Sequence, residues 1–325
     1  MKILGHIHTF NDEEVIDLSL QALLDQTYPL DEILIVDNAS TDRTLQRSFP
    51  DKVTVIRHHE NLGTSGAVAT GLQYGIAHQY DFAWILDADC VAEKDALEKL
   101  VALYESFPTE LKAQVWRLSS LPMEQLNWAV MKASVRLAGF AGYMSPQPRH
   151  GIVFTDRGFE RVIPTEGEDV YECDGTIWSG NLFKLSAVKK IGLPNPDYVL
   201  DWGEYEYGYV GKSNGYRAFV HQESLLKHNI TGVSTASYTT YRIGPVAFNM
   251  IELPPIRCYY TVRNVLYFWL HVYHRRNILT VAPKVYKVLM LTLNFMLRPF
   301  SHLSELSACL RGVRDGLLGK IQRRY

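Results

Sequence analysis

The chain has 325 residues, 47% of them hydrophobic, which is enough for one large or two small domains with a sizeable core. Its formal net charge of −2 is unevenly distributed, because the segment from Tyr259 onward carries 11 Lys and Arg against 2 Asp and Glu, a net +9 that leaves −11 for the preceding residues. This distribution argues against nucleic-acid binding. It favours a catalytic body held on an anionic membrane surface by a basic tail.

The cysteines and the N-terminus indicate the compartment. The four cysteines are scattered and form no C-x-x-C pair, which fits a reducing compartment and argues against a disulfide scaffold or a structural zinc site. The sequence from Met1 enters a predicted strand without the features of a signal peptide, and no window offers the roughly 18 uninterrupted apolar residues of a membrane span. We therefore expect a protein in the cytoplasm, peripheral on the inner face of the cell membrane.

Residues 1–105 alternate between predicted strands and helices with short connections. This alternation predicts an α/β fold with a mostly parallel, doubly wound sheet flanked by helices. No G-x-G-x-x-G follows the first strand, which disfavours a nicotinamide or flavin domain. The predicted strands are Ile3–His8, Glu32–Val36, Val53–Arg57 and Phe82–Leu86, and the predicted helices are Glu13–Leu24, a short one capped near Thr41 or Asp42, and Thr64–His78.

Two carboxylates follow the apolar strand Phe82–Leu86, at Asp87 and Asp89. The carboxyl ends of parallel strands face the crevice where open α/β sheets bind ligands. Two carboxylates placed there repel each other unless a cation or a proton neutralises them, and their oxygens favour Mg²⁺ or Mn²⁺. The alternative is structural, with Asp89 as the N-cap of the next helix.

Polar residues also follow the other three predicted strands. An aspartate at Asp37 could accept a hydrogen bond from the N3–H of a uracil or thymine ring. The structural alternatives are an Asx-turn for Asp37-Asn38 and a helix entry for the Asn61-x-Gly63 pair. The residues that we expect at this crevice, apart from the two aspartates, are Thr9, Asn11, Asp37, Asn38, Asn61 and Gly63.

These four motifs, in this order over the first 100 residues, resemble the family 2 glycosyltransferases with the GT-A fold. The resemblance implies a nucleotide-sugar donor. It places Asp37 on the base, and Asp87 and Asp89 on the ribose and on a metal-bound diphosphate.

Residues 106–175 carry weaker signals. Leu126–Leu137 has helical apolar spacing, and Ala141–Arg161, rich in Gly, Pro and Arg, is predicted to be a long loop that could close over a donor. Within that loop, Arg149, His150 and Arg157 could meet phosphate or simply be solvated.

A second polar block runs from Asp174 to Gly232. Ser179-Gly180 interrupts a predicted strand at Ile177–Phe183, where backbone could approach a ligand closely. Three carboxylates then follow within six positions, at Asp201, Glu204 and Glu206. Sugar transfer with inversion needs one carboxylate as general base and a separate cation for the leaving diphosphate. The alternative is a solvated helix start with favourably placed acids.

This block resembles bacterial rhamnosyl- and galactofuranosyltransferases. The resemblance places the base at Glu204, where the family commonly has Asp, so that Asp201 remains an alternative base or an orienting residue. It also implies that His228 completes the metal site with Asp87 and Asp89. The arginine usually found a few residues later is replaced here by Val210, which leaves contacts to the acceptor or diphosphate at that point in doubt.

Two tryptophans near this block, Trp178 and Trp202, are candidate sugar-stacking surfaces or core residues.

The C-terminal segment changes character after Pro255. We expect a catalytic domain over residues 1–255, with a nucleotide-sugar half at 1–105 and an acceptor half at 174–232, followed by a basic amphipathic helical region over 256–325. Its apolar helical patterns cover Tyr259–Val272, Val285–Leu297 and Leu303–Ile321. Such helices associate with membrane surfaces, and the alternatives are a helical cap on the domain or a homo-oligomer interface.

Together these features predict an inverting glycosyltransferase that depends on Mn²⁺ or Mg²⁺. It would move rhamnose or galactofuranose from a dTDP- or UDP-sugar to a lipid-linked or cell-surface glycan acceptor, and we expect polyprenyl diphosphate as the carrier. One alternative is a nucleotidyltransferase, which is disfavoured because the acidic Thr9–Glu13 stands where its basic phosphate loop would be. The other is a non-catalytic scaffold of a polysaccharide-assembly complex, which donor hydrolysis would exclude.

Overall fold

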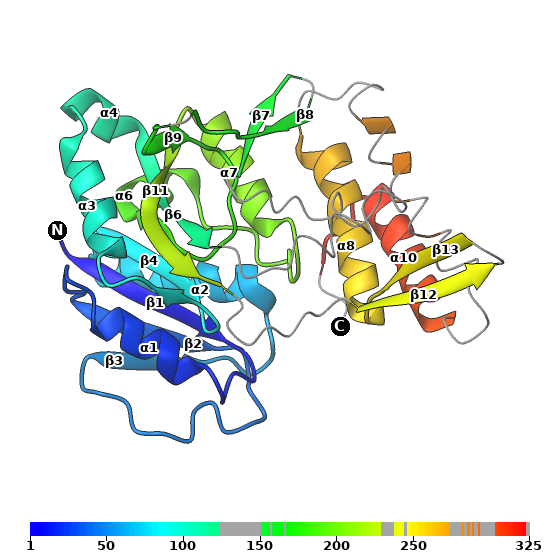
Figure 1. The fold of residues 1–325 in the computed structure, drawn as a ribbon, viewed down its shortest axis with the longest axis horizontal. Coiled ribbons are helices and arrows are strands. Elements are labelled where there is room, and N and C mark those ends of the chain that lie inside the picture. Colours follow the sequence, from blue (N-terminus) through cyan, green and yellow to red (C-terminus); the bar gives the residue numbers. More distant parts are fainter. Residues whose placement is uncertain are drawn as a thin grey trace.

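The computed structural model describes residues 1–123, 151–156, 158–165, 167–228, 237–243, 246–273 and 303–322, with six further positions between 281 and 292. Its core is a mixed sheet in the order β3-β2-β1-β4-β10-β6-β11-β5, with β9 paired to β11 (Figure 1). The sheet strands are β1 (Ile3–Thr9), β2 (Glu32–Asp37), β3 (Val53–Arg57), β4 (Phe82–Asp87), β5 (Val91–Ala92), β6 (Val115–Met123), β9 (Val170–Glu172), β10 (Asn181–Lys184) and β11 (Arg217–Lys227).

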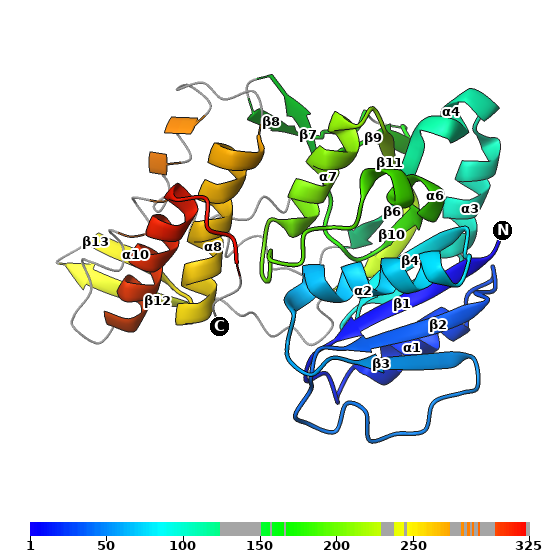
Figure 2. The same cartoon turned by 180° about the vertical axis from the view of Figure 1, so that it is seen from behind.

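The first four strands are parallel. β1, β2 and β4 are buried on both faces, which is why they are almost continuously apolar, whereas the edge strand β3 is partly exposed. Helix α1 (Ile16–Leu24) covers one face and α2 (Gly63–Ala77) the other, as Figures 1 and 2 show from opposite sides. On the first face α1 shares a core with α3 (Ala96–Ser106), and on the second α2 shares one with α6 (Leu185–Ile191). The short α4 (Thr109–Gln114) leads into β6. The predicted α/β fold, with a sheet flanked by helices, is confirmed; the sheet was expected to be mostly parallel and is mixed.

Antiparallel strands complete the second half of the sheet. β10 lies between β4 and β6 and runs antiparallel to both, and β5 and β9 run antiparallel to β11. Beyond the sheet, α7 (Gly203–Ser213) packs through its tyrosines against α8 (Pro255–Tyr267) and a turn of π-helix, η2 (Phe268–Val272). Helix α10 (Leu303–Leu317) lies against α8. The hairpin β12 (Ser237–Ile243) and β13 (Val246–Glu252) is separate from the main sheet.

Three local predictions are corrected. No helix follows Thr41, because the Asp42 carboxylate accepts hydrogen bonds from the amides of Thr44 and Glu13 and so ties an irregular loop to the start of α1. Asp89 is not an N-cap, since β5 follows it and α3 begins only after Asp95. The end of the expected loop Ala141–Arg161 is a hairpin, β7 (Ile152–Thr155) and β8 (Gly158–Arg161).

Two other predictions concern residues outside the described ranges. The expected helix Leu126–Leu137 lies there, as do Arg149, His150 and Arg157. Over the part of the chain that is described, no helix is both long and apolar enough to cross a lipid bilayer.

Candidate active site

The site forms where β4 ends. Asp87 is the last residue of β4, and the parallel register places it beside His8 of β1. One carboxylate oxygen of Asp87 contacts His8 Nε2, and the other lies 3.1 Å from His228 Nε2. His228 follows β11 directly, and 141 positions separate it from Asp87 in the chain. The fold therefore places two imidazoles on one carboxylate.

Asp89 belongs to the same cluster. Its Oδ1 lies 3.8 Å from His228 Nε2, and one ligand atom from each of Asp87, Asp89, Cys90 and His228 can be chosen so that all lie within 4.8 Å of one another. Two carboxylates and an imidazole form an oxygen and nitrogen donor set that suits Mg²⁺ or Mn²⁺. Burial raises the pKa of the Cys90 thiol to about 11, and its soft sulfur does not suit these hard cations. The three residues predicted to bind the metal lie together.

The charges of this cluster depend on one another. Burial would raise the pKa of Asp87, but the imidazoles of His8 and His228 hold it well below its usual range. Burial and the neighbouring Asp87 charge raise the pKa of Asp89 to about 6. A divalent cation would lower the pKa of Asp89 again, because it stabilises both ionised carboxylates together.

Ser179 and Gly180 join the second half of the sheet to this cluster. The Ser179 hydroxyl donates to Asp87 Oδ2 (2.6 Å) and accepts from the Asp87 amide (2.7 Å). Gly180 adopts φ +83°, which disfavours a residue with a side chain, and its amide donates to the Ile85 carbonyl at 2.8 Å. The small-residue break predicted before β10 is thus the place where the chain reaches the end of β4.

The candidate base lies in the first turn of α7. Burial raises the pKa of Glu204 to about 8, and the nearby charges of Asp201 and Asp87 add to this shift. A carboxylate with a raised pKa accepts a proton readily once it is ionised. Glu206 lies on another face of the same helix, where burial raises its pKa to about 7 and its charge acts on Tyr198 and Tyr267.

Asp201, the alternative base, is engaged by α8. Its carboxylate accepts hydrogen bonds from Arg257 (3.2 Å) and Thr261 (2.9 Å), and the Asn264 amide donates to its carbonyl at 2.9 Å. Asp201 and Trp202 both have positive φ, 54° and 72°, a conformation that costs energy for residues with a side chain. The contacts from α8 hold this strained turn, from which α7 and Glu204 begin.

The residues predicted to bind the nucleotide lie at the carboxyl ends of the parallel strands, as Asp87 does. Asp37 is fully buried, accepts hydrogen bonds from the Ser40 amide at 3.2 Å and lies 3.3 Å from Arg57 Nε. The Asn38 amide donates to the Gly63 carbonyl (3.2 Å), and Asn61 Oδ1 accepts from the Gly63 amide (2.7 Å). The turn at Asp37 and the helix entry at Asn61 are therefore both formed.

The first loop completes this edge. Thr9 donates to Asp12 (2.8 Å), and Asn11 accepts from the Thr41 amide (2.8 Å). These bonds fix the backbone of the loop that follows β1, so that its polar groups lie in one place beside the loop that follows β2.

The candidate sugar-stacking role of Trp202 is corrected. Its side chain is 1% exposed and packs against Tyr205, Phe268 and Trp269, so its ring lies in the core and offers no face to a sugar. Trp178 is also buried, beside Phe183 and Tyr207.

Three further residues contact the site but were not singled out from the sequence. His8 belongs to a His-x-His alternation at the end of β1, which places both imidazoles on one face of the strand. That alternation was a usable signal. Arg257 and Thr261 had none, because their partner, Asp201, is 56 and 60 residues away.

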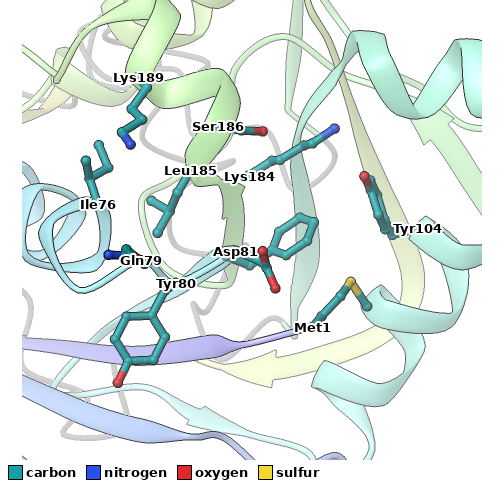
Figure 3. Close-up of a pocket in the computed structure, with 11 residues that line it drawn as sticks. Met1, Ile76, Gln79, Tyr80, Asp81, Tyr104, Lys184, Leu185, Ser186 and Lys189 are labelled. Carbon is teal, nitrogen blue, oxygen red and sulfur yellow. The ribbon is translucent and has the colours of Figure 1, made fainter.

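A separate pocket of about 430 Å³ lies at the other end of the strands, where β4 begins (Figure 3). Asp81 and Lys184, at the start of β4 and the end of β10, line it together with Tyr80, Tyr104 and Met1. Several of its polar groups already have partners: Asp81 accepts from the Lys2 amide (2.7 Å), and Lys184 donates to the Lys112 carbonyl (2.7 Å). It contains none of the predicted site residues.

Comparisons with known proteins agree with this geometry. The family model for Glycosyl transferase family 2 matches residues 6–133. An undecaprenyl-phosphate mannosyltransferase of Micrococcus luteus is 26% identical over 161 residues, covering 48% of this chain and 63% of that protein. Galactofuranosyltransferase GlfT1 of Mycobacterium tuberculosis is 28% identical over 185 residues, covering 54% of this chain and 53% of that protein. The alignments thus span little more than half the length of these two relatives.

Solved structures share the fold over nearly the whole chain. The mannosyltransferase PcManGT from Pyrobaculum calidifontis, in complex with GDP-Man and Mn²⁺, has a TM-score of 0.54 at 14% identity and covers 98% of this chain and 88% of that one. TarS 1-349 of S. aureus, in complex with UDP, has a TM-score of 0.52 at 14% identity and covers 99% and 82%. Residues 6–133 thus match the family 2 glycosyltransferases, and the chain has the fold of these two solved transferases.

Proposed function

We propose that the chain transfers a sugar, with inversion, from a nucleotide-sugar donor to a glycan hydroxyl. The observation that supports this most is the proximity of two unlike carboxylate sites. The cluster of Asp87, Asp89 and His228 suits a divalent cation, while Glu204 lies close enough for the Asp87 charge to raise its pKa. A cation bound at the cluster would stabilise the negative charge on the leaving diphosphate.

The residues divide the reaction between them. Asp37 and Asn38 would bind the base and Asp87 the ribose, with Thr9, Asn11, Asn61 and Gly63 shaping the crevice. Glu204 would take the proton from the acceptor hydroxyl while its oxygen bonds to the anomeric carbon, and the bond from that carbon to the diphosphate oxygen breaks. The products are the glycoside, the nucleoside diphosphate and a protonated Glu204.

Asp201 is assigned the positioning role. Its carboxylate is engaged by Arg257 and Thr261, whereas Glu204 carries the raised pKa of a proton acceptor. This division favours Glu204 as the base and leaves Asp201 to fix the start of α7.

For the substrates, we keep the donor as a dTDP- or UDP-sugar, with rhamnose or galactofuranose, and the acceptor as a polyprenyl-diphosphate-linked glycan. The likeness to GlfT1, a galactofuranosyltransferase, supports the sugar class, and the likeness to an undecaprenyl-phosphate mannosyltransferase supports a polyprenyl carrier. The solved structures include complexes with both GDP-Man and UDP, so GDP belongs in any test of the nucleotide.

Calorimetric titration tests the donor and metal assignments. UDP, dTDP and GDP are titrated into the full chain with Mn²⁺ or with chelator, using the wild type, Asp89→Ala and the control Asp51→Ala, which removes an exposed carboxylate before β3. We expect UDP or dTDP to bind in the low micromolar to millimolar range only with metal, and Asp89→Ala alone to abolish binding. Binding that ignores both metal and Asp89 would overturn the metal site. Absence of donor hydrolysis would favour the scaffold alternative.

A further inference from the structure

Helix α10 has an unusual distribution of side chains. Its buried residues are small or polar, namely Ala308, Cys309, Gly312, Asp315 and Gly316. Its large apolar residues include Leu303, Leu310 and Leu317, which are 59%, 53% and 51% exposed, and Leu318, just beyond the helix, is 60% exposed. A helix that only caps a soluble domain normally turns its leucines inward. Here three of the four leucines of α10 lie on the outward face, while Leu306 and Val313 pack against the core.

The inner face explains how α10 is held without those leucines. A Cβ at Gly312 would lie 2.7 Å from the Tyr259 carbonyl oxygen, and one at Gly316 would lie 2.8 Å from Leu266 Cβ. The two helices therefore approach closely at these glycines. Tyr259 also donates a hydrogen bond to the buried Asp315 carboxylate at 2.9 Å. Because α8 already holds α10 through this face, the outer leucines are left for another occupant.

The charged residues on the outer face indicate what that occupant is. Leu303, Leu310 and Leu317 recur every seven residues and so form one stripe along the helix. The other exposed positions within α10 are Ser304, Ser307, Arg311 and Arg314, so its exposed charges are positive. The segment from Tyr259 onward, which includes α10, has a net charge of +9. An apolar stripe flanked by arginines complements the interface of an anionic bilayer.

We propose that the outer face of α10, defined by Leu303, Leu310, Leu317, Arg311 and Arg314, docks the protein on an anionic lipid surface. Figures 1 and 2 show α8 and α10 side by side at the end of the molecule away from β1, β2 and β3. Since α8 also holds Asp201 through Arg257 and Thr261, the docking helix pair is one contact away from the turn that carries Glu204. This inference rests on the proposed function only in supplying a reason for docking, namely an acceptor on a lipid carrier.

Vesicle sedimentation tests the proposal on the full chain. Purified protein is mixed with vesicles of phosphatidylcholine alone or with 30% phosphatidylglycerol, at low and high salt. We expect sedimentation with the anionic vesicles that high salt weakens. Arg311→Gln with Arg314→Gln should weaken that binding roughly 30-fold, because each basic residue near the surface contributes about 1 kcal/mol. Leu303→Ser with Leu310→Ser and Leu317→Ser should abolish binding to the anionic vesicles.

Matched variants separate docking from general surface changes. Leu18→Ser removes a leucine of similar exposure, 56%, from α1, and Lys189→Gln with Lys190→Gln removes two exposed cations from α6. Both should bind vesicles as the wild type does, and the unfolding midpoint of every variant should stay near that of the wild type. If the triple leucine variant unfolds, Leu310→Ser alone replaces it.

Two results would overturn the proposal. One is equal binding of wild type and leucine variants to anionic vesicles. The other is a wild-type dimer in light scattering that the leucine variants convert to monomer, without vesicle binding, which would assign the stripe to a second copy of the chain. Because neither assay contains donor, failure here leaves the glycosyltransferase proposal intact. Failure of nucleotide binding likewise leaves the docking result intact.

Discussion

The two acidic groups of the crevice differ in how their charge is compensated. Asp87, at the end of β4, contacts two imidazoles, and its pKa is held well below the usual range. Glu204, at the start of α7, has its pKa raised to about 8 by burial and by neighbouring carboxylates. A compensated carboxylate stays ionised and suits binding, whereas an uncompensated one suits proton transfer. In the proposed reaction, this difference would let Asp87 help to bind a charged donor while Glu204 deprotonates a neutral acceptor.

The largest effect on activity is expected when Glu204, the uncompensated carboxylate, is replaced. Glu204→Gln should lower kcat by roughly 10²–10⁴-fold, since a positioned general base contributes about that much. The Kd for nucleotide and metal, measured by calorimetry, should stay within about threefold of the wild type. Asp201→Asn provides the comparison, and a loss of activity there equal to that of Glu204→Gln would reassign the base.

The role of Asp87, the compensated carboxylate, is tested by replacing its partner His8. His8→Ala should weaken metal-dependent nucleotide binding roughly 10–100-fold, the usual effect of losing a residue that orients a metal ligand. His8→Gln, whose amide can still donate to Asp87, should recover part of the affinity. Titration of Mn²⁺ at fixed nucleotide measures both. A lower unfolding midpoint with unchanged Mn²⁺ affinity would show that His8 is only structural.

The pH profile distinguishes the two carboxylates. With its pKa raised to about 8, Glu204 is mostly protonated at pH 6, so kcat/KM should rise about tenfold per pH unit until the limb near 8 is reached. Bound metal would shift that limb to lower pH, because its positive charge favours the ionised carboxylate. Nucleotide binding should not follow this limb. A flat profile between pH 6 and 8 would contradict the assignment of Glu204.

The smallest effect concerns Glu206, two residues along α7. Burial raises its pKa to about 7, so the folded state binds a proton that the unfolded state has already released. Stability is therefore greatest below pH 4.5 for this group and falls as pH rises toward 7. Glu206→Gln should stabilise the fold by about 1–3 kcal/mol at pH 8 and by almost nothing at pH 4. Urea unfolding at the two pH values measures this, and equal effects at both would contradict it.

The predictability of the fold follows the range of the interactions involved. The four parallel strands of residues 1–105 were predicted almost to the residue, because such a strand is a short apolar run between turn residues, whereas the two-residue antiparallel β5 was missed. The helix expected near Thr41 failed because the Asp42 carboxylate bonds to amides, one of them 29 residues away. A side chain that satisfies distant backbone leaves no local pattern.

The site shows the same limit. Asp87, Asp89 and His228 were predicted to lie together by resemblance to a known motif order, and they do. His8 was missed because 79 residues separate it from Asp87 in the chain, and only the pairing of β1 with β4 brings the two residues side by side. The sequence left Trp202 as either a sugar-stacking surface or a core residue, and the structure places its ring in the core, after the left-handed turn at Asp201.

The position of β10 has a consequence for how the chain reaches its native state. β10 enters the sheet between β4 and β6, nearly 100 residues after β4 has been synthesised. Until it does, the apolar β4 is an edge strand with unpaired backbone groups, a ready template for pairing with another chain. The N-terminal segment alone would thus be prone to aggregation. Fragments that end before Lys184 should be insoluble, whereas those that include β10 and β11 close the edge and complete the site in one event.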